Sequence, residues 1–162
     1  MPKEIRNPNA DLQDVLARME REDSAFWNWG GGTPENGFAL REEPATMNPP
    51  PNLMERVALF GERIVRFAKR VPRGMNHPEH NRLVDQLVGA GTSVGANYSE
   101  ADDAVSGKNF KSKIGISRKE SKETMFFLRM IAASEAGLAE EARELWREAK
   151  ESNLIFGSLW RK

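Results

Sequence analysis

The chain has 162 residues, enough for one ordinary domain with a real hydrophobic core, and its 24 basic side chains balance 24 acidic ones. It contains no Cys, which excludes a disulfide framework, a thiolate metal site and a Cys nucleophile. No apolar run approaches the roughly 18 residues of a membrane span, and the N-terminal segment lacks the apolar core of a secretion signal. We therefore expect a cytoplasmic protein that does not associate with membranes.

The first third of the chain differs from the rest. Residues 1–51 carry a net charge of −4, whereas residues 52–162 carry +4. Apolar residues at helical spacing in residues 10–22 predict one short helix, after which Gly and Pro cluster and the periodicity is lost. We predict that residues 1–51 form an N-terminal arm and linker. Three aromatic side chains in the arm either anchor a protein partner or pack back on the bundle, and both alternatives remain open: Phe26, Trp27 and Trp29.

From Asn52 onward the apolar residues follow the 4-3 spacing of bundle helices. Asn52 is a candidate N-cap. Pro72 and Gly74 end the first predicted helix, and Pro78 lies in the first turn of the second. Four helices are predicted, over residues 53–71, about 77–105, about 108–136 and 138–159. No strand-like alternation is present, and short connections favour antiparallel neighbours. The predicted fold class is an all-α, antiparallel up-down four-helix bundle in residues 52–162.

The second predicted helix has a face of small residues. Gly89, Gly91 and Gly95 lie within it, although a helical Gly costs roughly 1 kcal/mol relative to Ala. The segment superficially resembles a phosphate-binding loop, but it lacks a Lys after the last Gly and a preceding strand. We therefore predict that the small face allows a neighbouring helix to approach closely.

Residues 81–131 resemble a known family. The matching elements are Gln86-Leu87, the run TSVGANY at 92–98, Phe110, the run KIGI at 113–116, Glu120, Glu123-Thr124 and Leu128. They are similar to the bacterial four-helix-bundle proteins, also called the S23 or 23S rRNA intervening-sequence family. The resemblance implies a four-helix bundle over about residues 53–160. Some members form ring-like homopentamers. One relative is the accessory protein of a reverse transcriptase in diversity-generating retroelements, and its basic surface binds nucleic acid.

Two clusters of cations are candidates for binding RNA or DNA through phosphates. Their members are Arg63, Arg66, Lys69, Arg70, Arg73, Lys108, Lys111, Arg118, Lys119 and Lys122. Solvated helix faces are the simpler interpretation of such runs. A third use is contact between subunits, where basic faces meet an acidic patch. That patch comprises Glu79, Asp85, Glu100, Asp102 and Asp103.

Three polar residues predict a structural link inside the bundle. Asn97 lies in the small-residue helix, and Glu120 and Glu123 lie three residues apart on the next helix. A buried amide needs hydrogen-bond partners, so we expect a buried polar link between the two helices. Catalytic carboxylates are the alternative interpretation, but the sequence indicates no substrate pocket beside them.

His77 and His80 are three residues apart, which permits metal binding. The segment begins a helix, and the chain has no other His or Cys to complete a site, so we expect solvated side chains here. We expect no catalytic residue, cofactor or metal. The predicted function is that of a non-enzymatic homo-oligomeric accessory or scaffold protein, with nucleic-acid binding as a hypothesis. The alternative is a structural or protein-interaction oligomer without nucleic-acid binding.

Overall fold

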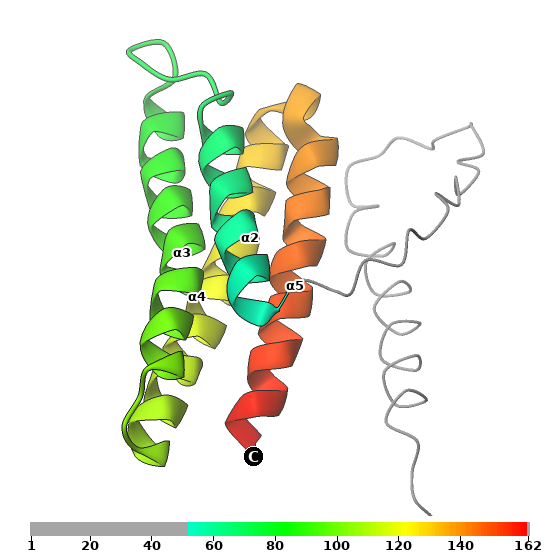
Figure 1. The fold of residues 1–162 in the computed structure, drawn as a ribbon. Coiled ribbons are helices and arrows are strands. Elements are labelled where there is room, and N and C mark those ends of the chain that lie inside the picture. The colour runs from blue at the N-terminus through cyan, green and yellow to red at the C-terminus, as the bar shows by residue number, and fades with distance from the viewer. Residues whose placement is uncertain (1–51, 162) are drawn as a thin grey trace, which may run out of the picture. The chain divides into compact units, whose positions relative to one another are not determined.

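The structure is a computed structural model that describes residues 52–161, and within them it consists of helices without strands (Figure 1). The long helices are α2 (Leu53–Ala68), α3 (Pro78–Asp102), α4 (Gly107–Ser134) and α5 (Ala139–Arg161), with a short 3-10 helix η1 (Ala136–Leu138) before α5. Successive long helices run antiparallel (Figure 1). The predicted all-α four-helix bundle is confirmed. The predicted short helix at residues 10–22 and the aromatic side chains Phe26, Trp27 and Trp29 lie outside the described residues.

The helix ends follow local chemistry. The side chain of Asn52 accepts a hydrogen bond from the backbone N–H of Glu55 at 2.8 Å, and Ser106 caps α4 by accepting from Asn109 at 3.2 Å. Gly74, with φ of +115°, allows the turn between α2 and α3. The prediction that the second helix reaches Val105 is wrong. Ser106 has the extended backbone that an N-cap needs, so α3 ends at Asp102 and leaves Val105 98% exposed.

The core consists of one apolar stripe from each helix. Phe60, Ile64 and Phe67 of α2 are fully buried, as the 4-3 spacing predicts. The other large buried side chains are Leu87 and Val94 of α3, Ile114, Leu128 and Ile131 of α4, and Leu145 and Phe156 of α5. Helix α4 packs extensively on both α3 and α5, and α2 packs on α3 much more than on α5. No helix within residues 52–161 is long and apolar enough to cross a bilayer.

The small-residue face of α3 lies against α2 at two of its three glycines. A Cβ on Gly91 would be 2.8 Å from Ile64 Cγ2, and one on Gly95 would be 3.4 Å from the carbonyl oxygen of Val57. A Cβ on Gly89 would have no heavy atom within 4 Å apart from the adjoining backbone of its own helix. Close helix packing therefore explains Gly91 and Gly95 but not Gly89.

Candidate nucleic-acid interface

Two arginines of α2, and one that follows its last residue, form ion pairs with α5. The Arg56 guanidinium donates to Glu148 at 2.7 Å and also to Glu151. The hydrogen bond to Glu148 raises the pKa of Arg56 against the opposing effect of partial burial. Seven and fourteen residues later, Arg63 pairs with Glu144 at 3.6 Å and Arg70 pairs with Glu141. We call this row of pairs the α2–α5 ladder.

Of the remaining predicted cations near α2, both arginines have ion-pair partners closer in the sequence. Arg66 pairs with Glu62 at 2.5 Å, and Arg73 pairs with Asp85 at 2.8 Å. Lys69 has no ion pair among those of residues 52–161. Exposed pairs are worth only about 0.2–1 kcal/mol, so a phosphate could displace a carboxylate. A bound phosphate would nevertheless have to compete with a carboxylate at each predicted arginine of this cluster.

Fewer of the predicted cations of α4 form ion pairs. Lys108, Lys111 and Lys122 are exposed and have no ion pair among those found in the described part of the chain. Lys119 pairs with Glu123 at 3.2 Å but stays 69% exposed, and the hydrogen bond from this pair raises the pKa of Lys119. The exposed surface of α4 therefore keeps more of its positive charge accessible than α2 does.

Arg118 differs from its neighbours on α4 because it lies against α5. A Cβ on Gly157 of α5 would be 3.6 Å from Arg118 Nε, and that nitrogen is buried without a hydrogen-bond partner within residues 52–161. The backbone carbonyl of Arg118 accepts a 2.7 Å hydrogen bond from the buried side chain of Asn153. Arg118 thus helps to join α4 to α5.

An exposed indole lies beside the lysines of α4. Trp160 of α5 is 48% exposed, and its Nε1 would be 3.7 Å from a Cβ on Gly115 of α4. Lys111 and Lys119 are four residues before and after Gly115, so all three positions share one face of α4. An aromatic ring and two cations therefore occupy neighbouring surface. Trp160 was absent from the predicted site because its position depends on the register of α5 against α4.

The predicted polar link behaves differently in the structure. Asn97 is half-buried, and its amide donates within its own helix to the carbonyl of Ser93 at 2.9 Å. Glu123 pairs with Lys119, and no hydrogen bond among the described residues joins Asn97, Glu120 and Glu123. The hydrogen bond between these helices comes instead from the buried hydroxyl of Ser117, which donates to the carbonyl of Val94 at 3.2 Å. Burial, and then the charge of Glu123, raises the pKa of Glu120.

One groove runs along α2 and α3, with a volume of about 580 Å³. Its lining includes the small residues Ala58, Gly61 and Gly95 and the charged residues Glu62, Arg66 and Lys69. Glu62 is already paired with Arg66.

The two histidines do not lie as predicted. His77 is partly exposed, but His80 is 1% exposed and lies under the end of α4. The expectation that both side chains are solvated is therefore wrong for His80. The reason is that His80 occupies an inward position of α3, one turn before the buried Val84.

Comparisons with known proteins agree with the fold. A model of the family described as 23S rRNA-intervening sequence protein matches residues 54–157. A crystal structure from Bacteroides thetaiotaomicron, described as a protein with unknown function from the S23 ribosomal protein family, is similar with a TM-score of 0.60. It is 28% identical, and the match covers 67% of this chain and 98% of that one. No curated protein matches the chain.

Proposed function

Because the chain belongs to the family of 23S rRNA-intervening sequence proteins, we propose that it is a non-enzymatic accessory protein that binds single-stranded nucleic acid on the α4–α5 face. The observation that carries the proposal is the exposed Trp160 beside Gly115, with Lys111 and Lys119 one turn to either side. The structural neighbour is described as having unknown function, so the proposal rests on the surface of this chain.

The chemistry of this face fits a flexible strand better than a duplex. An exposed indole offers a stacking surface for a base of any identity, worth about 1–3 kcal/mol per base. Lysines on either side can hold the phosphates of the neighbouring nucleotides. Binding on this face is therefore expected to depend on salt and to be tolerant of sequence.

Fluorescence anisotropy with labelled single-stranded RNA and DNA tests the proposal. Trp160→Ala should weaken binding by a factor of roughly 5 to 150, which is the loss of one stacked base. The double variant Lys111→Gln with Lys119→Gln should reduce the slope of log K against log salt by about 1.4. Lys69→Gln serves as a control, because it removes one positive charge at the C-terminal end of α2. The proposal is wrong if the unmodified chain does not bind at low salt, or if Lys69→Gln weakens binding as much as Trp160→Ala.

We also propose self-association, which a different observation favours. Phe126 on α4 is 56% exposed, and its ring meets that of Phe127 edge-on at 5.3 Å. Phe is among the residue types that are enriched in protein–protein interfaces relative to the rest of the surface. The family resemblance makes a ring of five subunits the expected assembly.

Light scattering distinguishes the assembly from a monomer of 18.2 kDa. The unmodified chain should have a mass several times larger at micromolar concentration, and Phe126→Ser should lower it. Leu59→Ser, at a similarly exposed apolar position on α2, should leave the mass unchanged. A monomeric mass for the unmodified chain would rule out self-association and would leave the nucleic-acid proposal intact.

A further inference from the structure

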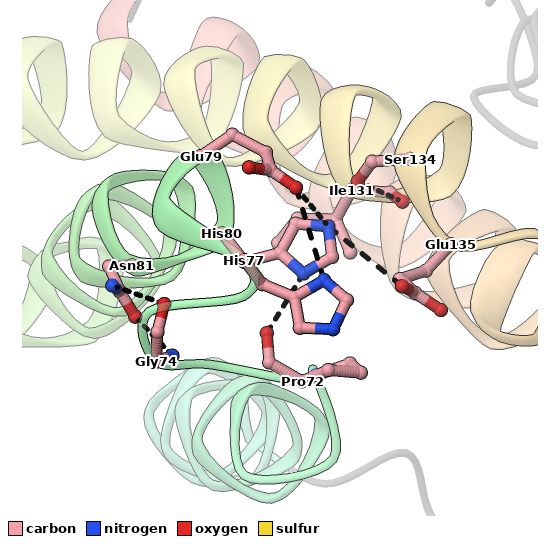
Figure 2. A network of polar contacts seen from close by, with 9 residues as sticks. All are labelled: Pro72, Gly74, His77, Glu79, His80, Asn81, Ile131, Ser134 and Glu135. Atoms are coloured by element: carbon pink, nitrogen blue, oxygen red, sulfur yellow. Dashed lines mark hydrogen bonds and ion pairs between the residues drawn. The ribbon is translucent and has the colours of Figure 1, made fainter.

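A polar cluster forms where α3 begins and α4 ends (Figure 2). Three potential metal ligands, one each from His77, Glu79 and His80, lie within 4.8 Å of one another. Glu135, at the end of α4, adds a carboxylate whose Oε1 is 3.9 Å from His80 Nε2. This cluster lies at the opposite end of the bundle from the C-terminal end of α5, which carries Trp160 (Figure 1).

One atom of the cluster has no partner. His80 Nε2 is buried, and no hydrogen-bond partner for it is found within the described residues. The other ring nitrogen, Nδ1, is 2.8 Å from the carbonyl oxygen of Pro72. A carbonyl oxygen can only accept, so Nδ1 carries the proton and donates it to Pro72. In the neutral ring, Nε2 is then left with a lone pair that faces into the cluster.

This arrangement matches a histidine that binds a metal. Metal-binding histidines almost always donate their second ring N–H to a carbonyl or a carboxylate, which fixes the tautomer and the ring orientation. The contact of His80 with Pro72 supplies that second interaction. The loop that carries Pro72 is itself fixed, because the Asn81 side chain accepts from the backbone N–H of Gly74 at 3.0 Å and donates to its carbonyl at 3.3 Å (Figure 2).

The distances favour an ion over a direct proton bridge. His80 Nε2 is 3.8 Å from Glu79 Oε1 and 3.9 Å from Glu135 Oε1, both beyond hydrogen-bond range. Two ligand atoms that share a tetrahedral zinc ion lie about 3.3 Å apart, since each is roughly 2.0–2.1 Å from the metal. The observed gaps exceed that value by about half an ångström, which small side-chain rotations can close.

We propose that this cluster binds a divalent transition-metal ion of the zinc type through four side chains: His77, Glu79, His80 and Glu135. Two imidazoles with two carboxylates suit zinc, whereas magnesium and calcium prefer oxygen ligands alone. His77 must turn, because its ring now stacks parallel to that of His80 at 5.0 Å and the two lone pairs do not converge. Its side chain is 40% exposed and free enough to do so. The ion would then tie the end of α4 to the start of α3.

Composition makes the test specific. His77 and His80 are the only histidines in the whole chain, which has no Cys, so imidazole binding can occur in one place. Untagged full-length protein, freed of metal with a chelator, is titrated with zinc chloride in a calorimeter. Cobalt chloride then reports the ligand geometry through its visible spectrum. We expect one zinc ion per chain, a tetrahedral cobalt spectrum, a rise in Tm with zinc and no such rise with magnesium.

Variants decide whether the ion sits at the cluster. His80 is buried, so its replacement can unfold the protein. The test therefore replaces the more exposed ligands His77 and Glu135. His77→Ala and Glu135→Gln should each weaken zinc binding by at least about 10-fold. Asp103→Asn, at the far end of α3, is the matched control and should bind as the unmodified chain does. The proposal is overturned if about 100 µM zinc leaves Tm unchanged, or if His77→Ala with Glu135→Gln binds zinc as tightly as the control does.

Discussion

Gly91 of α3 faces Ile64 of α2 at a crossing that leaves no room for a Cβ atom. A Cβ built on Gly91 would be 2.8 Å from Ile64 Cγ2, 2.9 Å from Cγ1 and 3.2 Å from Cβ. The contact atoms belong to a β-branched side chain with few available rotamers, itself fully buried. The two helices therefore approach as closely as they do only because residue 91 is Gly.

Gly91→Ala should destabilise the bundle by about 1–3 kcal/mol, because the added methyl forces Ile64 or the helices apart. Gly89→Ala is the matched control, since it lies in the same helix with no heavy atom within 4 Å. It should be neutral or stabilising by up to about 1 kcal/mol through helix propensity. Urea denaturation measures both free energies of unfolding. Equal effects for the two variants would contradict a packing role for Gly91.

Glu120→Gln should raise stability at neutral pH and have little effect in acid. Burial and the charge of Glu123 raise the pKa of Glu120 above its ordinary value of 4.5, so the folded chain holds this proton more tightly than the unfolded chain does. As pH rises through that ordinary value toward the raised one, the unfolded state loses its proton first and stability falls. Because Glu120 is partly solvated, the gain at pH 7 should be below about 0.5 kcal/mol. Thermal melts at pH 3.5 and pH 7 measure it, and a larger gain in acid would contradict this sign.

Arg56→Ala should cost more than Arg70→Ala, although both remove one rung of the α2–α5 ladder. The Arg56 side chain is 28% exposed and meets two carboxylates, whereas that of Arg70 is 58% exposed and meets one. We expect about 1–3 kcal/mol for Arg56, as for a hydrogen-bonded charge in a partly buried place. For Arg70 we expect about 0.2–1 kcal/mol, as for an exposed pair. Chemical denaturation at low salt ranks the two, and the reverse order would show that burial does not set the strength of these pairs.

Residues 52–162 should fold without the first 51. Every helix that contributes to the described core lies after Asn52, and the N-cap of α2 is made by Asn52 itself. Circular dichroism of the shortened chain should show a helical protein with a cooperative thermal transition. A mostly unfolded fragment would instead mean that residues 1–51 complete the core.

The repeating pattern of the sequence predicts the fold well but predicts long-range polar contacts poorly. The spacing of Val57, Phe60 and Ile64 identified the buried face of α2 because a helix repeats every 3.6 residues. Arg56 and Glu148 are 92 residues apart in the chain, and their pairing depends on how α2 and α5 are aligned. Glu135 approaches His80 for the same reason, and no local signal indicates either contact. For Asn97 the error runs the other way. A hydrogen bond to another helix was expected, but its amide donates to Ser93 in the same helix.

The α2–α5 ladder gives the bundle one boundary that differs in kind from the others. Elsewhere the helices are held mainly by buried apolar side chains, with the pair of Lys113 and Glu100 as an ion pair between α4 and α3. Between α2 and α5 packing is sparse, and the rungs are partly exposed charges, which salt weakens. Added salt should therefore weaken this boundary more than the others. The segment before Asn52 is continuous with α2 in the chain. A force on that segment, or a partner bound to it, would therefore act first on α2, whose contact with α5 is weakened by salt.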